Sequence, residues 1–65
     1  MNIEQKEFLE NVIGAFKDDP EACNEWEQGF MNDMAERFDK YGERTYVSAK
    51  QWSIITRVAD HYGVT

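Results

Sequence analysis

The sequence predicts an all-α fold, either a compact three-helix bundle or an orthogonal array of three helices, in one domain over residues 1–65. Apolar residues recur at helical spacing in three segments, at about residues 2–17, 20–41 and 48–62. Capping motifs precede the segments, and glycines or a proline interrupt the chain between them. Amphipathic helices of this kind become stable by burying their apolar faces against one another.

The first segment is typical of an amphipathic helix with an acidic outer face. Asn2, with Gln5 three positions later, fits a capping box. At 100° per residue one wedge of the helix is apolar, and it comprises Phe8, Leu9, Val12, Ile13, Ala15 and Phe16. The opposite side carries Glu4, Glu7, Glu10 and Asn11.

The second segment has two candidate starts. Asp19 can cap a helix with Pro20 at its first position, or Asn24 can cap it with Glu27 closing a capping box. The predicted apolar face comprises Trp26, Phe30, Met34, Phe38 and Tyr41, with Met31 at its border. Glu27 and Arg37 interrupt this face. The capping box accounts for Glu27, and a packed stem with a solvated head accounts for Arg37.

The third segment has the clearest start signal. Ser48 and Gln51 fit a capping box, and Val47 is placed to pack on Trp52 as a hydrophobic staple. Gly42 and Gly63 are suited to ending the second and third helices. The apolar face of the third helix comprises Trp52, Ile54, Ile55, Val58, Ala59 and Tyr62.

The composition indicates a globular protein. The 65 residues are 42% hydrophobic, and the formal net charge is −6. Cys23 is the single cysteine, so no disulfide can form within the chain, and a lone thiol suits a reducing compartment. The start, MNIEQKEFLE, lacks the pattern of a signal peptide, and no apolar stretch is long enough to cross a membrane. We therefore expect a cytoplasmic protein that does not bind membranes.

The residues that usually carry catalysis or bind metal are scarce. Cys23 is the only thiol and His61 the only imidazole, and a Cys–His nucleophilic pair would need both in contact. One cysteine and one histidine fall short of the four ligands of a structural zinc site. The four glycines are isolated, so no phosphate-binding loop is formed. We expect no enzyme, no catalytic residue, no cofactor and no metal.

The positive charge is gathered around one turn. Five of the seven Lys and Arg lie within eight residues of the stretch TYVSAKQW, at residues 45–52. Three explanations remain open: complementing a helix dipole, pairing with the acidic first helix, or meeting a negatively charged partner. The candidate partner-binding residues are Arg37, Lys40, Arg44, Tyr46, Lys50, Ile54, Arg57 and His61.

Two stretches resemble parts of known proteins. Glu25-Trp26-Glu27-Gln28-Gly29-Phe30, followed by Ser48-Ala49-Lys50-Gln51 opening a helix with Ile55 and Val58, resembles small helical proteins encoded by bacteriophages. Similar Ser-x-Lys-Gln helices occur near the ends of some phage replication and recombination proteins. The resemblance implies an accessory protein that binds and alters a host protein, or a helper at nucleic acid.

We therefore expect a non-enzymatic protein-interaction module, such as a phage-encoded inhibitor or adaptor acting on a host protein. One alternative is a nucleic-acid-binding accessory protein that uses the basic stripe of the third helix; the net acidity ranks it below a protein partner. Another is an acidic decoy that imitates phosphates. A homodimer that hides Trp26 or Trp52 is compatible with all three.

Overall fold

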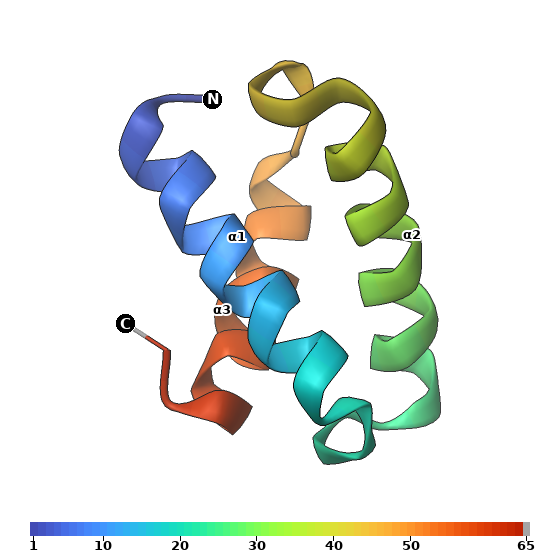
Figure 1. Cartoon of the computed structure of the whole chain (residues 1–65). Coiled ribbons are helices and arrows are strands. Elements are labelled where there is room, and N and C mark those ends of the chain that lie inside the picture. The colour runs from blue at the N-terminus through green and yellow to red at the C-terminus, as the bar shows by residue number, and fades with distance from the viewer. Residues whose placement is uncertain (65) are drawn as a thin grey trace.

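Three helices connected by two single-turn 3-10 helices form the protein (Figure 1). The computed structural model describes residues 1–64. Helix α1 spans Ile3–Asp18, α2 spans Glu25–Tyr41 and α3 spans Ala49–Tyr62, while η1 covers Pro20–Ala22 and η2 covers Gly42–Arg44. The predicted all-α fold with three helices is confirmed, and residues 1–64 contain no strand.

Each helix begins with the capping box that the sequence predicts. Asn2, Asn24 and Ser48 accept a hydrogen bond from the backbone N–H three positions on, and the side chain at that position accepts one in return. The second helix therefore starts after Asn24. Residues 20–22, which were expected to open that helix, instead form η1 with Pro20 at its start. Proline suits the first position of a helix of any length, so Pro20 does not prevent a longer helix; the extended backbone of Asn24 separates η1 from α2.

The turn between α2 and α3 depends on a glycine. Gly42 has φ 57° and ψ −132°, a region that only glycine adopts without strain. Thr45 then closes the turn, because its hydroxyl donates to the Gly42 carbonyl at 2.7 Å. The N-terminal amine of Met1 donates to the Glu43 carbonyl at 2.9 Å, which brings the start of the chain against η2.

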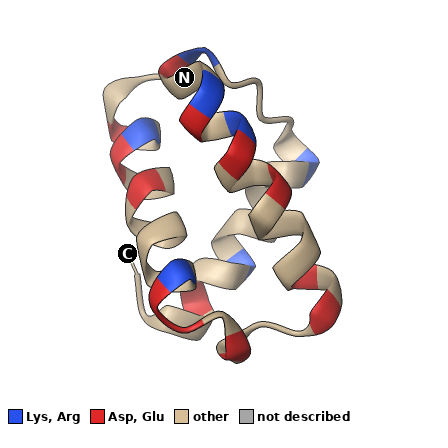
Figure 2. Ribbon diagram, turned by 45° about the vertical axis from the view of Figure 1, so that its right-hand side comes forward, with Lys and Arg blue, Asp and Glu red and all other residues tan. Residues whose placement is uncertain are grey.

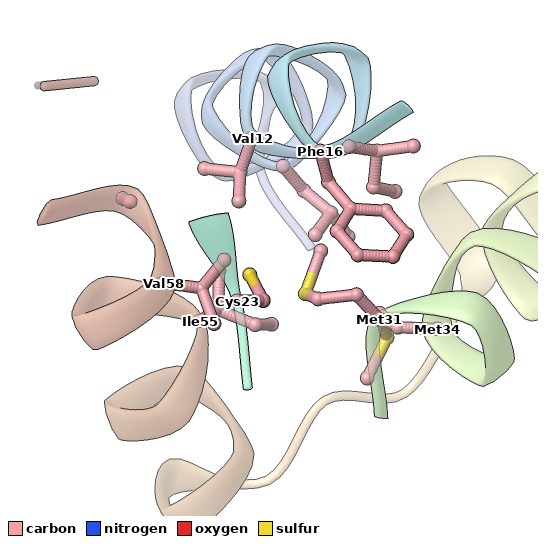
Figure 3. Close-up of a cluster of buried hydrophobic side chains, with 10 residues drawn as sticks. Val12, Phe16, Cys23, Met31, Met34, Ile55 and Val58 are labelled. Atoms are coloured by element: carbon pink, nitrogen blue, oxygen red, sulfur yellow. The ribbon is translucent and has the colours of Figure 1, made fainter. Parts of the chain in front are cut away.

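One apolar core lies between the three helices. Val12 and Phe16 of α1, Met31 and Met34 of α2, and Ile55 and Val58 of α3 point toward a common centre, with Cys23 beside them (Figure 3). The fully buried side chains are dominated by aliphatic residues and methionine, which fill irregular space with little strain. The complete core comprises Leu9, Val12, Ile13, Phe16, Cys23, Met31, Met34, Ile55, Val58 and Ala59.

The inward face of α2 differs from the predicted one. Met31, predicted at the border of the apolar face, is 0% exposed, whereas Trp26 and Tyr41, predicted on that face, are 59% and 52% exposed. The helix is turned so that Glu27, Met31 and Met34 face the core. Slender methionines fit between the helices, and this orientation leaves the large rings of Trp26 and Tyr41 outside.

The end of α3 is tied to the end of α1. The Tyr62 hydroxyl donates to the Asp19 carbonyl at 2.7 Å and lies 3.3 Å from the Cys23 sulfur. Burial and the hydrogen bond with Cys23 raise the pKa of Tyr62 well above its ordinary value, so the phenol stays protonated as a donor. Among residues 1–64, no helix is both long and apolar enough to cross a bilayer.

Candidate functional site

A buried carboxylate joins α2 to α3. Glu27 is 3% exposed, and its Oε2 lies 3.2 Å from His61 Nε2 and 3.5 Å from Arg57 Nε. Its other oxygen accepts the backbone N–H of Asn24 at 3.1 Å, as the capping box requires. The first turn of α2 therefore carries a buried negative charge, and Arg57 and His61 of α3 contact it.

The carboxylate is ionised by its surroundings. Burial by itself raises the pKa of Glu27, but the hydrogen bond from the Asn24 backbone and the contacts with His61 and Arg57 outweigh it, and the pKa lies below its ordinary value of 4.5. The negative charge of Glu27 is hidden because its side chain is buried, whereas the side chain of Arg57 is 62% exposed. Solvent and any partner meet the cationic side of this pair.

One of the three explanations left open by the sequence, that the basic third helix pairs with the acidic first helix, is not supported by the structure. Within residues 1–64 no ion pair joins α1 to α3; the acidic partner of α3 is Glu27 of α2. The remaining pairs are local, Lys6 with Glu10 and Asp33 with Arg37. Figure 2 shows acidic residues along both α1 and α2 and in the turn that joins them. The acidic face of α1 is left to solvent.

A hollow of about 380 Å³, which we call the groove, lies between α2 and α3. Ile54 supplies an apolar floor, and Lys50 and Arg57 lie on either side of it along α3. Lys50 has no ion-pair partner among residues 1–64. The complete lining is Trp26, Lys50, Ser53, Ile54 and Arg57.

The α2 wall of the groove is an ordered aromatic stack. Trp26 lies parallel to Phe30, with ring centroids 5.8 Å apart and an interplanar angle of 8°. Phe30 is half-buried against the core, so it fixes Trp26 from behind although Trp26 itself is exposed. An exposed ring held in place loses little conformational entropy when a partner covers it.

A second hollow, of about 490 Å³, lies at the other end of α2, and we call it the loop pocket. Tyr46 beside it is 80% exposed and Tyr41 is 52% exposed. Lys40 lies 5.4 Å from the centre of the Tyr41 ring, a cation–π distance. The complete lining is Arg37, Tyr41, Arg44, Thr45, Tyr46, Ser48 and Gln51.

The eight residues named from the sequence fall into two neighbouring groups and one exception. Arg37, Arg44 and Tyr46 line the loop pocket, with Lys40 at its rim over Tyr41. Lys50, Ile54 and Arg57 line the groove. His61 lines neither hollow and contacts Glu27.

Sequence reasoning missed Trp26 and Glu27 as parts of this surface. Helical spacing places Trp26 on the apolar face, and the sequence analysis names it only as a residue that a homodimer could hide. Glu27 was explained by its capping box, which is correct but incomplete. The sequence contained a signal for this contact. Glu27 interrupts the apolar face of its helix, a buried carboxylate needs a partner, and Arg57 and His61 lie one turn apart on another helix.

The thiol and the imidazole have separate partners. The Cys23 sulfur contacts the Tyr62 hydroxyl, and His61 contacts Glu27. Within residues 1–64 no group of three or more His, Cys, Asp or Glu is arranged to hold a metal ion. Comparisons with protein-family models, with curated proteins and with solved structures found no significant match.

Proposed function

We propose that this chain is a non-enzymatic protein-interaction module that binds an acidic protein surface across the face formed by α2 and α3. The observation that carries the proposal is the exposed Trp26, held on Phe30 beside Ile54 and bordered by Lys50 and Arg57. Tryptophan, tyrosine and arginine dominate the residues that supply binding energy at protein interfaces.

The loop pocket extends the same chemistry. Tyr41 and Tyr46 are exposed next to Arg37 and Arg44, so aromatic rings and guanidinium groups recur along this side of the molecule. An isolated exposed ring needs no explanation, but three such rings beside two hollows form a surface typical of interfaces. An inhibitor or adaptor that acts on a host protein would need a surface of this kind and no catalytic site.

Site-specific photo-cross-linking in the cells that naturally express the chain tests the proposal. A photoreactive amino acid replaces Trp26 in one variant and Glu10, on the outer face of α1, in a matched control. We expect one protein adduct from position 26 and none from position 10. An adduct from position 10 alone would favour the acidic-decoy hypothesis instead, and the absence of a protein adduct from position 26 would overturn the proposal.

Nucleic-acid binding is the second candidate, and the loop pocket favours it. Exposed tyrosines between arginines can stack on unpaired bases while the guanidinium groups contact phosphates. Such binding weakens steeply with salt because counterions are released. Titration of a fluorescent single-stranded oligonucleotide with the protein, at low and at moderate salt, tests for this binding. We expect Arg44→Glu to weaken the binding, and no detectable binding at low salt would exclude this candidate.

A further inference from the structure

We infer that the groove takes one class of partner, an amphipathic α-helix that carries two carboxylates seven residues apart with an aliphatic residue between them. The inference deepens the proposed function and rests on it. Lys50, Ile54 and Arg57 define this pattern, because they present cation, apolar and cation along one edge of α3.

The spacing on α3 sets the spacing on the partner. Lys50 and Arg57 are seven residues apart, which is two helical turns or about 10 Å along the axis. A helix packed nearly parallel or antiparallel to α3 repeats its own contacts every seven residues. Two carboxylates at that interval can therefore meet Lys50 and Arg57 together, with an aliphatic side chain against Ile54.

The walls of the groove favour a helix over an extended segment. Residues 1–64 contain no strand, so no sheet edge is available for a partner strand to join. The groove instead lies between two helices, with the Trp26–Phe30 stack as its outer wall. A helix of the partner laid between α2 and α3 would cover Trp26 and Ile54. It would pack on these two helices from outside, as α1 packs on them from the side of the core.

Charge distinguishes the two cationic positions. Lys50 has no ion-pair partner in the part of the chain that the structure describes, so a partner carboxylate meets a free ammonium group. Arg57 is held through Nε by the buried Glu27 while most of its side chain is exposed. Glu27 thus orients Arg57 toward the groove, and Lys50 supplies the uncompensated charge.

A second copy of this chain does not fit the pattern. No two acidic residues stand seven apart within any one of its three helices. The acidic residues of α1 instead follow each other three apart, at Glu4, Glu7 and Glu10. The occupant is therefore a different protein.

Fluorescence of Trp26 tests the inference with synthetic peptides. In the Trp52→Phe variant Trp26 is the only tryptophan, and its exposed ring reports coverage by a shift of emission to shorter wavelength. The probe is a helical peptide with two glutamates seven positions apart and a leucine between them. The control peptide has the same composition, with the second glutamate moved to the opposite helical face.

We expect the matched peptide to shift the emission and to bind at least about tenfold more tightly than the control peptide. Lys50→Glu should remove that preference, and one of the two peptides in which a single glutamate is replaced by lysine should restore binding to this variant, because its lysine meets position 50 while its glutamate meets Arg57. Lys17→Glu, on the exposed last turn of α1, is the matched control and should change nothing. If Trp52→Phe does not fold, the indole N–H resonance of Trp26 in the unaltered chain gives the same readout.

Two results would overturn the inference. Equal binding of the matched and control peptides would mean that the groove binds acidic peptides whatever the spacing of their glutamates. Absence of binding by either peptide would mean that an acidic helix is the wrong occupant. Both results differ from failure of the proposed function, which is decided by the cross-link from position 26. A protein adduct there without peptide binding would leave the interaction standing and remove only this partner class.

Discussion

The two sides of α3 are built differently. On its inward side, Ile55, Val58 and Ala59 are buried in the apolar core that α3 shares with α1 and α2. Toward α2, the backbones approach each other less closely, and a buried carboxylate joins the helices through Arg57 and His61. The inward side is covered by the other two helices, whereas the groove side leaves Trp26 exposed and Ile54 partly exposed beside the unpaired charge of Lys50.

Because of this difference, one side of α3 stabilises the fold and the other side is available to bind a partner. Apolar burial is non-directional and scales with the area removed from water, so the inward side of α3 supplies more of the stability than the groove side. A buried ion pair contributes less net stability but fixes which groups face each other. Holding α2 and α3 together through Glu27 keeps them in place without using the apolar surface of Ile54 and Trp26.

Adjacent isoleucines give the largest predicted effect. Ile55 is 0% exposed in the core, so Ile55→Ala should lower the free energy of unfolding by about 3 kcal/mol, through lost burial and a cavity. Ile54 lines the groove, so Ile54→Ala should cost less than about 1 kcal/mol. Urea denaturation followed by circular dichroism measures both. Equal losses for the two variants would contradict the division of α3 into two sides.

The turn that places α3 beside α2 gives the next effect. Gly42→Ala should cost about 1–3 kcal/mol, because φ 57° with ψ −132° is strained for any residue with a side chain. The matched control is Gly14→Ala inside α1, where a Cβ meets nothing within 4 Å. This control should stabilise the protein by about 0.5–1 kcal/mol. Thermal unfolding measures both variants, and the melting temperature should fall for Gly42→Ala and rise for Gly14→Ala.

The carboxylate between α2 and α3 should make stability depend on pH. The pKa of Glu27 is lower in the folded chain than in the unfolded chain, so its stabilising effect is present above pH 4.5 and is lost as the pH falls through the folded-state pKa. Glu27→Gln should therefore cost about 1–2 kcal/mol at neutral pH and almost nothing in strong acid. The exposed Glu10→Gln is the control and should show no such convergence.

The exposed aromatic ring gives the smallest effect on stability. Trp26 is 59% exposed, so Trp26→Ala should change the free energy of unfolding by less than about 0.5 kcal/mol. The same substitution should remove capture of the protein that cross-links to position 26. A large loss of stability would return Trp26 to the core, where the sequence pattern placed it.

The local structure was predictable because its determinants lie within a few residues of one another. Each capping box, the stop at Gly63 and the inward face of α1 follow from spacing along one helix. The site was harder to predict because it depends on how α2 is rotated against α3. The contact of Glu27 with His61 joins residues 34 positions apart, and spacing within one helix carries no information about it.

The same rotation decided which aromatic rings are outside. On the isolated helix Trp26 and Met31 lie at opposite borders of the apolar face, and packing in three dimensions turns the Met31 border inward. Lys50, Ile54 and Arg57 could be named in advance because all three lie on one helix and share one edge of it. Their aromatic counterpart on α2 could not.

The most direct test of the central claim measures capture and stability on one preparation of the Trp26→Ala, Ile54→Ala double variant. The claim is that the α2–α3 side is reserved for binding. We predict a free energy of unfolding within about 1.5 kcal/mol of that of the unaltered chain and capture of the cross-linked protein reduced at least about tenfold. Undiminished capture by the folded double variant would contradict the claim.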